Sequence, residues 1–140
     1  MKKELNVLIF RAKTFDTLEG MQNKEGIPFE VKTINDELST YYEIIGCDYV
    51  EITGRRIGNN RYMIVCDENG RYADDVIFTV INKDGYLDIA GTVVIAGPPT
   101  HGDLTSLTQS DIVNIVNNIG VIKQETESGI KYVPVITCNG

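Results

Sequence analysis

The central third of the chain is a series of short strand-like segments with no helical pattern between them. From residue 49 to residue 96, stretches rich in β-branched and aromatic residues alternate with turn residues. The turns fall at 58–60, at Asn69-Gly70 and at 82–85. Short connections favour pairing between successive strands, so the pattern predicts antiparallel strands. The expected strands are 49–53, 62–66, 76–81 and 87–96, the last of them interrupted by Gly91.

Two short helices are expected on either side of these strands. The first, 36–45, has Asn35-Asp36 as a candidate N-cap and Gly46 as a C-terminal glycine. The second begins at Thr108, a plausible N-cap, with Asp111 placed to complete a capping box and Gly120 as its terminating glycine. Apolar residues recur at helical spacing in both segments: Leu38, Tyr41, Tyr42 and Ile45 in the first, and Ile112, Val113, Ile115, Val116 and Ile119 in the second.

Further strands are expected near both ends of the chain. Residues 6–12 and 29–34 have strand-like patterns, whereas 13–26 is an irregular or partly helical connection. Residues 121–136 form a closing hairpin, in which Pro134 would place the last strand at a sheet edge. The prediction is a single α+β domain over 1–140, with a mostly antiparallel sheet, two short helices and a C-terminal β-hairpin.

Composition excludes several classes of protein. The 140 residues suit one domain, and 42% hydrophobic residues are too many for a disordered chain. The net charge of −7 disfavours duplex nucleic acid as a partner. No apolar run approaches the roughly 20 residues of a membrane span, and the N-terminal run is too short for a signal peptide. We therefore expect a cytoplasmic protein. Its three cysteines, Cys47, Cys66 and Cys138, have neither disulfide nor zinc-site spacing.

The arginines are distributed unevenly. Four of the five lie between residues 55 and 71, on or beside one predicted hairpin. Guanidinium groups bind phosphate and carboxylate through two parallel hydrogen bonds, and a neighbouring aromatic ring can stack on a ligand. The pattern indicates a site for a small anion such as a nucleotide; the alternative is a solvated hairpin whose arginines pair with nearby carboxylates. The candidate binding residues are Arg55, Arg56, Arg61, Tyr62, Arg71 and Tyr72.

Other constellations give weaker signals. The acidic pairs Asp67-Glu68 and Asp74-Asp75 lack the spacing of a calcium loop, and we expect no metal or cofactor. The single histidine, His101, lies two residues before Asp103, but the chain has no nucleophile-elbow motif. No glycine-rich phosphate loop is present. The sequence therefore identifies no catalytic residues and leaves enzymatic activity as a secondary hypothesis.

Three stretches in a fixed order resemble a known family. They are INDEL and IIGCDYVE within 34–51, IVCDENG at 64–70, and DIAGTVVIAG followed by TSLT within 88–108. Over roughly 29–120 the chain resembles domain-of-unknown-function family 3846, small proteins of bacteria, phages and mobile elements. Residues 71–78 depart from the family pattern because they contain no Pro or Asn, and 121–140 is an extension. The resemblance implies a phage or mobile-element accessory protein without an established activity.

Three functions remain open. The leading hypothesis is a non-enzymatic, homo-oligomeric anti-defence protein that sequesters a small anionic ligand such as a nucleotide second messenger. The alternative is an acidic protein that inhibits a host protein or mimics DNA. The third is a small hydrolase that uses His101.

Overall fold

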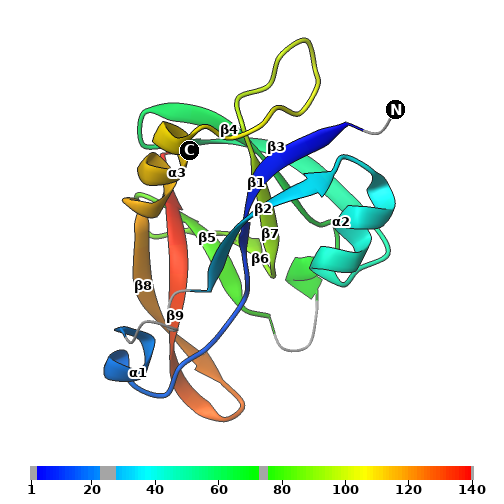
Figure 1. Cartoon of the computed structure of the whole chain (residues 1–140). Helices are drawn as coiled ribbons and strands as arrows, with labels where there is room; N and C mark the ends of the chain where they lie inside the picture. Colours follow the sequence, from blue (N-terminus) through cyan, green and yellow to red (C-terminus); the bar gives the residue numbers. More distant parts are fainter. Residues whose placement is uncertain (1–2, 23–27, 73–75, 140) are drawn as a thin grey trace.

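The computed structural model describes residues 3–22, 28–72 and 76–139, which form two β-sheets and three short helices (Figure 1). The strands of the first sheet are β1 (Glu4–Phe10), β2 (Phe29–Asn35), β3 (Val50–Ile57), β4 (Asn60–Asp67) and β7 (Val93–Ala96). Those of the second are β5 (Phe78–Asn82), β6 (Leu87–Ala90), β8 (Ile119–Thr126) and β9 (Gly129–Cys138). The helices are α1 (Leu18–Gln22), α2 (Leu38–Ile45) and α3 (Gln109–Val116), with a 3₁₀ turn at Gly70–Tyr72. The α+β class and the closing hairpin are confirmed.

The first sheet has the order β2-β1-β7-β4-β3, and all its pairs are antiparallel. The predicted hairpin at 58–60 is confirmed, since β3 pairs with β4 from Val50↔Asp67 to Ile57↔Asn60. One other expectation is wrong, because β4 and β5 do not pair. The interruption expected at Gly91 is confirmed: the run 87–96 is divided there, where φ is +85°, and its two halves lie in different sheets. Which sheet each strand joins is decided by the burial of apolar surface between the two sheets, and no local turn signal encodes that choice.

The second sheet has the order β6-β5-β9-β8, and β5 and β9 pair in parallel. Strand β9 is therefore central, which corrects the prediction that Pro134 marks an edge. On that side of β9, Tyr132 exchanges two backbone hydrogen bonds with Phe15, at 2.8 and 2.9 Å, and pairing with β5 begins at Ile136. Pro134 lies between Tyr132 and Ile136, opposite neither Phe15 nor β5. Its nitrogen carries no hydrogen, and at this position no neighbouring strand needs a hydrogen bond from it.

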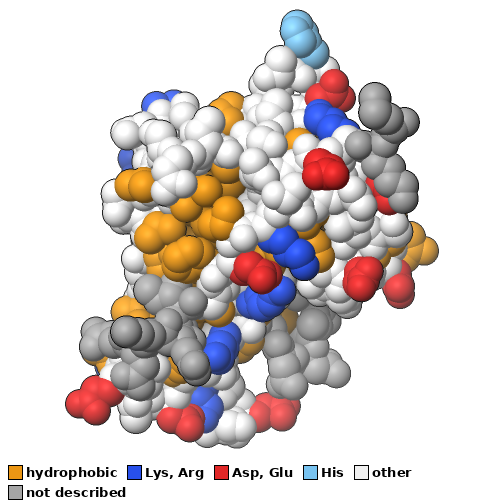
Figure 2. All heavy atoms as spheres, in the orientation of Figure 1, with side chains coloured by type: hydrophobic (Ala, Val, Ile, Leu, Met, Phe, Trp, Pro, Cys, Tyr) orange, Lys and Arg blue, Asp and Glu red, His pale blue; other side chains and the backbone are white. Residues whose placement is uncertain are grey.

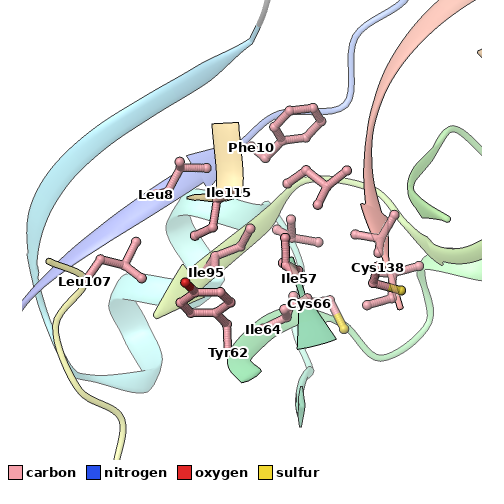
Figure 3. Packing of buried hydrophobic residues seen from close by; sticks show 14 residues of the cluster. Leu8, Phe10, Ile57, Tyr62, Ile64, Cys66, Ile95, Leu107, Ile115 and Cys138 are labelled. Carbon is pink, nitrogen blue, oxygen red and sulfur yellow. The ribbon is translucent and has the colours of Figure 1, made fainter. Parts of the chain in front are cut away.

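The first sheet is covered on both faces. Alternate residues of β1 illustrate this: Leu5, Val7 and Ile9 face α2, whereas Leu8 and Phe10 face the second sheet and α3. Figure 3 shows the inner cluster, in which side chains from β1, β3, β4, β7 and α3 meet those of β9. This cluster consists of Leu8, Phe10, Ile57, Tyr62, Ile64, Cys66, Val80, Ile89, Val93, Ile95, Leu107, Ile115, Ile136 and Cys138.

The helix ends are partly as expected. Helix α2 ends at Gly46 in the left-handed region, but its N-cap is Glu37 without a side-chain cap bond, since the Asp36 carboxylate accepts a 2.8 Å hydrogen bond from the Tyr41 hydroxyl instead. Helix α3 begins with the predicted capping box of Thr108 and Asp111. It ends at Asn117, and Gly120 belongs to β8.

Candidate functional site

The β3–β4 hairpin divides the arginines between its two faces. Arg55 and Tyr62 are cross-strand partners, and so are Arg56 and Arg61. Because adjacent residues of a strand point to opposite faces, the first pair faces the second sheet and the second pair faces outward. Arg71 lies beyond β4 in the 3₁₀ turn. The six candidate residues therefore do not form one site.

Arg55 forms an ion pair with Asp88 of β6. Its Nε donates to Asp88 Oδ2 at 2.6 Å and its Nη2 donates to Asp88 Oδ1 at 2.9 Å, a bidentate arrangement. Nη1 donates to Thr53 Oγ1 and to the Gly54 carbonyl. About a quarter of each side chain is exposed. The hydrogen bonds from Arg55 hold the pKa of Asp88 below its usual value. Arg55 thus already has a carboxylate ligand from within the protein.

A small pocket surrounds this ion pair. Its volume is about 110 Å³, well below the roughly 300 Å³ at which ligand pockets begin. Arg71 lines the same pocket as Arg55. Four carboxylates outnumber these two guanidinium groups on its walls, so the pocket disfavours an anion. They are Glu51, Asp67, Glu68 and Asp88.

Tyr62 lies in the core. Its side chain has no exposed surface, and Figure 3 shows the ring beside Ile95, Ile64 and Ile115. Its hydroxyl donates to Asp111 Oδ1 at 3.0 Å and accepts from Asn114 Nδ2 at 2.9 Å. A ligand at the surface cannot stack on this ring.

Arg56 and Arg61 are both exposed, directly opposite each other at the end of the hairpin. The Arg56 carbonyl accepts from the Asn139 amide at 2.7 Å, so it points away from β4. The two arginines therefore form a non-hydrogen-bonded pair, the kind in which Cα atoms are only about 4.5 Å apart and side chains are closest. Within the described residues, neither guanidinium makes an ion pair or side-chain hydrogen bond.

Two features place this arginine pair. A Cβ on Gly54 would lie 2.6 Å from Arg61 Nη2 and 2.9 Å from Arg61 Nε, so the Arg61 side chain lies across the glycine. The hairpin turn is held by α3, because Asn114 Nδ2 donates to the Ile57 carbonyl at 2.8 Å and Asn114 Oδ1 accepts from the Asn59 amide at 3.3 Å. The pair thus lies on an anchored hairpin rather than on a free loop.

The remaining sequence candidates are distributed elsewhere. Tyr72 ends the 3₁₀ turn, and its side chain, like Asp74 and Asp75, lies outside what the structure describes. His101 and Asp103 are exposed in a turn between β7 and α3, with φ of +53° at His101. The histidine is the pale blue side chain at the tip of the projecting loop in Figure 2. Cys66 and Cys138 are buried between the sheets, so their thiols do not reach that tip.

Sequence reasoning missed a second basic region around Arg11. Arg11 lines two surface hollows of about 390 and 490 Å³, together with Lys13 in the first and Lys32 in the second. Figure 2 shows Lys and Arg side chains in the middle of the face where β1 and β2 lie. Arg11 Nη2 is 3.3 Å from Glu30 Oε1, so this arginine has a carboxylate partner. The β1–β2 register, Phe10↔Phe29, is the signal that joins these residues.

These observations define a small two-sheet α+β protein with an exposed arginine pair and no catalytic constellation among its described side chains. A family model, "Domain of unknown function (DUF3846)", matches residues 12–120. The chain belongs to this family. Comparison with curated proteins and with solved structures gave no match.

The described residues offer neither a membrane-spanning helix nor a metal-binding cluster. None of the helices in the described part of the chain is long and apolar enough to cross a membrane. The same residues contain no group of three or more His, Cys, Asp or Glu side chains arranged to hold a metal ion.

Proposed function

We propose that this protein is a non-catalytic binding protein that holds a small anion between Arg56 and Arg61. One observation carries the proposal: two exposed arginines lie directly opposite each other on neighbouring strands, and neither has a carboxylate partner in the described structure. Like charges directly opposite in a sheet are destabilising. In a protein with 20 Asp and Glu residues, an anion from solution is the partner that this pair lacks.

The chemistry of the pair suits phosphate. Each guanidinium offers a planar fork of N–H donors, and two forks on adjacent strands can hold two oxygens of one phosphate group. The Arg61 side chain is directed along the sheet by the absence of a side chain at Gly54. The Arg61 guanidinium therefore lies over Gly54, on the same face of β3 as Arg56.

A nucleotide fits better than inorganic phosphate. Ile52 lies on the same face of β3 as Gly54 and Arg56, and 48% of its side chain is exposed. This exposed apolar side chain is two positions from Gly54, over which the Arg61 guanidinium lies, and offers a surface for the face of a base. The biological role that we propose is that of a cytoplasmic accessory protein of a phage or mobile element, which sequesters a nucleotide second messenger.

Calorimetric titration at low salt tests this proposal with a panel of inorganic phosphate, mononucleotides and cyclic dinucleotides. We expect one class of nucleotide to bind, and Arg56→Gln or Arg61→Gln to weaken it by roughly tenfold or more, the worth of a charge-assisted hydrogen bond. Gly54→Ala keeps every charge but displaces the Arg61 guanidinium, so it should also weaken binding. Arg71→Gln and Arg11→Gln are the matched controls.

Two results would overturn the proposal. The first is an absence of heat for every anion in the panel. The second is an equal loss of affinity in a control variant, which would place the anion at the Arg55–Asp88 pocket or at the Arg11 hollows. An acidic surface that docks on a basic host protein stays the alternative, and a salt-sensitive pull-down by the Arg56→Gln, Arg61→Gln double variant would support it.

A further inference from the structure

Strand β2 is an edge of the first sheet, and its outer side carries no strand in the described structure. Ile34 is its only buried residue. Phe29 is 36% exposed and Val31 is 46% exposed, although both are good strand formers. An exposed edge of this kind is a template for pairing with another strand.

Two backbone hydrogen bonds show which residues of β2 direct their N–H and C=O groups to β1 and which direct them outward. The Arg11 amide donates to the Pro28 carbonyl, and the Asp36 amide donates to the Lys3 carbonyl, each at 2.8 Å. Hydrogen-bonded pairs alternate along an antiparallel ladder, so Glu30 and Lys32 direct their backbone groups to β1. The N–H and C=O groups of Phe29, Val31 and Thr33 consequently point outward from the sheet.

We propose that a second copy of this chain binds here, with the two β2 strands pairing antiparallel around a two-fold axis at Val31. Val31 then pairs with Val31 of the second copy, and Phe29 pairs with Thr33. All these residues have outward-pointing backbone groups, so they meet as hydrogen-bonded pairs. The arrangement is isologous, as in most homodimers, and joins the two five-stranded sheets.

Charge selects this register. When Val31 meets Val31, Glu30 lies directly opposite Lys32 of the second copy, twice by symmetry. These are non-hydrogen-bonded positions, where side chains approach most closely. The next registers that pair outward-pointing backbone groups are shifted by two residues of one copy in either direction. They place Glu30 opposite Glu30 or Lys32 opposite Lys32, and like charges so placed are destabilising.

Apolar surface beside the edge adds to the fit. Phe29 and Val31 lie on the same face of β2 as Thr33, opposite the face that carries Glu30 and Lys32. Figure 2 shows exposed apolar side chains over α3 and β8 on the same side of the molecule. Val113 of α3 is 50% exposed and Val121 of β8 is 41% exposed. Pairing of the β2 strands would cover Phe29 and Val31.

A disulfide test reports the register directly. In a Cys47→Ser background, Val31→Cys should form a covalent dimer in air, because Cα atoms of a hydrogen-bonded pair lie about 5.5 Å apart, within disulfide range. Phe29→Cys is the matched control. It faces Thr33, so its own copies lie about 13 Å apart, at 3.3 Å per residue, and should not link. Non-reducing gels and peptide mapping give the answer. Efficient linking of the control, or none of Val31→Cys, would overturn the proposal.

A charge-swap series tests the same pairing without a crosslink. By sedimentation at rising concentration and low salt, we expect the unmodified chain to dimerise, and Lys32→Glu to weaken the dimer by roughly tenfold or more. The double variant Glu30→Lys, Lys32→Glu restores opposite charges and should recover most of the affinity. Lys123→Glu on the β8 edge is the control and should have no effect. A monomeric unmodified chain, a double variant without recovery, or a disrupted β8 control would each contradict pairing through β2.

Discussion

Arg55 of β3 and Asp88 of β6 join the two sheets through a bidentate ion pair, with N–O distances of 2.6 and 2.9 Å. Asp88 Oδ2 also accepts a 3.5 Å contact from the thiol of Cys138 at the end of β9. The pair lies at the rim of the inner cluster, with about a quarter of each side chain exposed. It therefore stabilises the assembly of the sheets, which is a structural role for an arginine predicted to bind ligand.

Removal of one partner should destabilise the fold. Asp88→Ala leaves the Arg55 guanidinium partly buried without its carboxylate. We expect the free energy of unfolding to fall by about 1–3 kcal/mol, between the values for surface pairs and for buried pairs. Urea titration followed by circular dichroism measures the change. Asp84→Ala, at an exposed turn on the same hairpin, should cost little, and an equal loss in both variants would refute the role of the pair.

Acid should weaken the protein through two carboxylates. Hydrogen bonds from Arg55 lower the pKa of Asp88. Burial acts to raise the pKa of Asp111, but hydrogen bonds from Thr108, Tyr62 and Asn60 outweigh it and lower the pKa. A lowered native pKa gives stability that is present above about pH 4, the value of an unfolded aspartate, and is lost as the pH falls through the native values.

Thermal unfolding between pH 7 and pH 2 measures this dependence. Asp88→Asn should make the melting temperature less sensitive to pH below about pH 4, at the expense of stability at pH 7. Between pH 5 and pH 7, Asp88 and Asp111 should contribute almost no change to the melting temperature of the unmodified chain. A variant with the same acid slope as the unmodified chain would show that Asp88 does not contribute.

The buried hydroxyl of Tyr62 should also contribute to stability. Tyr62→Phe removes a donor to Asp111 and an acceptor for Asn114 without changing the ring. Because both partners lose a bond in a largely buried place, we expect a loss of about 1–3 kcal/mol in the free energy of unfolding. Tyr86→Phe, with 71% of the side chain exposed, is the control and should change little. Equal effects would mean that the network is not stabilising.

The three cysteines should react at different stages of unfolding. Burial raises the pKa of Cys66 to about 12, and both Cys66 and Cys138 lie in the inner cluster. Cys47 is half-buried, and burial together with the nearby Asp67 carboxylate raises its pKa as well. We expect a thiol reagent to modify Cys47 slowly in the native protein and the other two only on unfolding. Native modification that persists in Cys47→Ser would contradict this.

Local signals predicted several elements well. Thr108 and Asp111 form the expected capping box because its bonds depend on residues three apart. The β3–β4 hairpin follows from the turn residues between its strands. Gly120 was misassigned because Asn118 already bonds to β9: the Thr137 amide donates to its carbonyl at 2.9 Å. A strand partner 19 positions away ended the helix, and no periodicity encodes such a partner.

The arginine cluster shows where sequence reasoning ends for the site. Strand alternation separates Arg55 from Arg56 in advance, since neighbours on a strand point to opposite faces. Strand alternation cannot indicate which face of the β3–β4 hairpin the second sheet covers. That depends on β6, which brings Asp88 to Arg55 across 33 positions of the chain. The surviving candidates, Arg56 and Arg61, are those on the face that the second sheet leaves open.

The amino-acid sequence alone determined the α+β fold class, the positions of most strands, the start of α3 and membership of the DUF3846 family. These properties depend on residue preferences and hydrogen bonds within a few positions of the chain. The tertiary structure decided which strands share a sheet, the central place of β9, the burial of Tyr62 and the division of the arginines. Each of these follows from covering both faces of the first sheet at once, and the burial of apolar surface rewards only the complete arrangement.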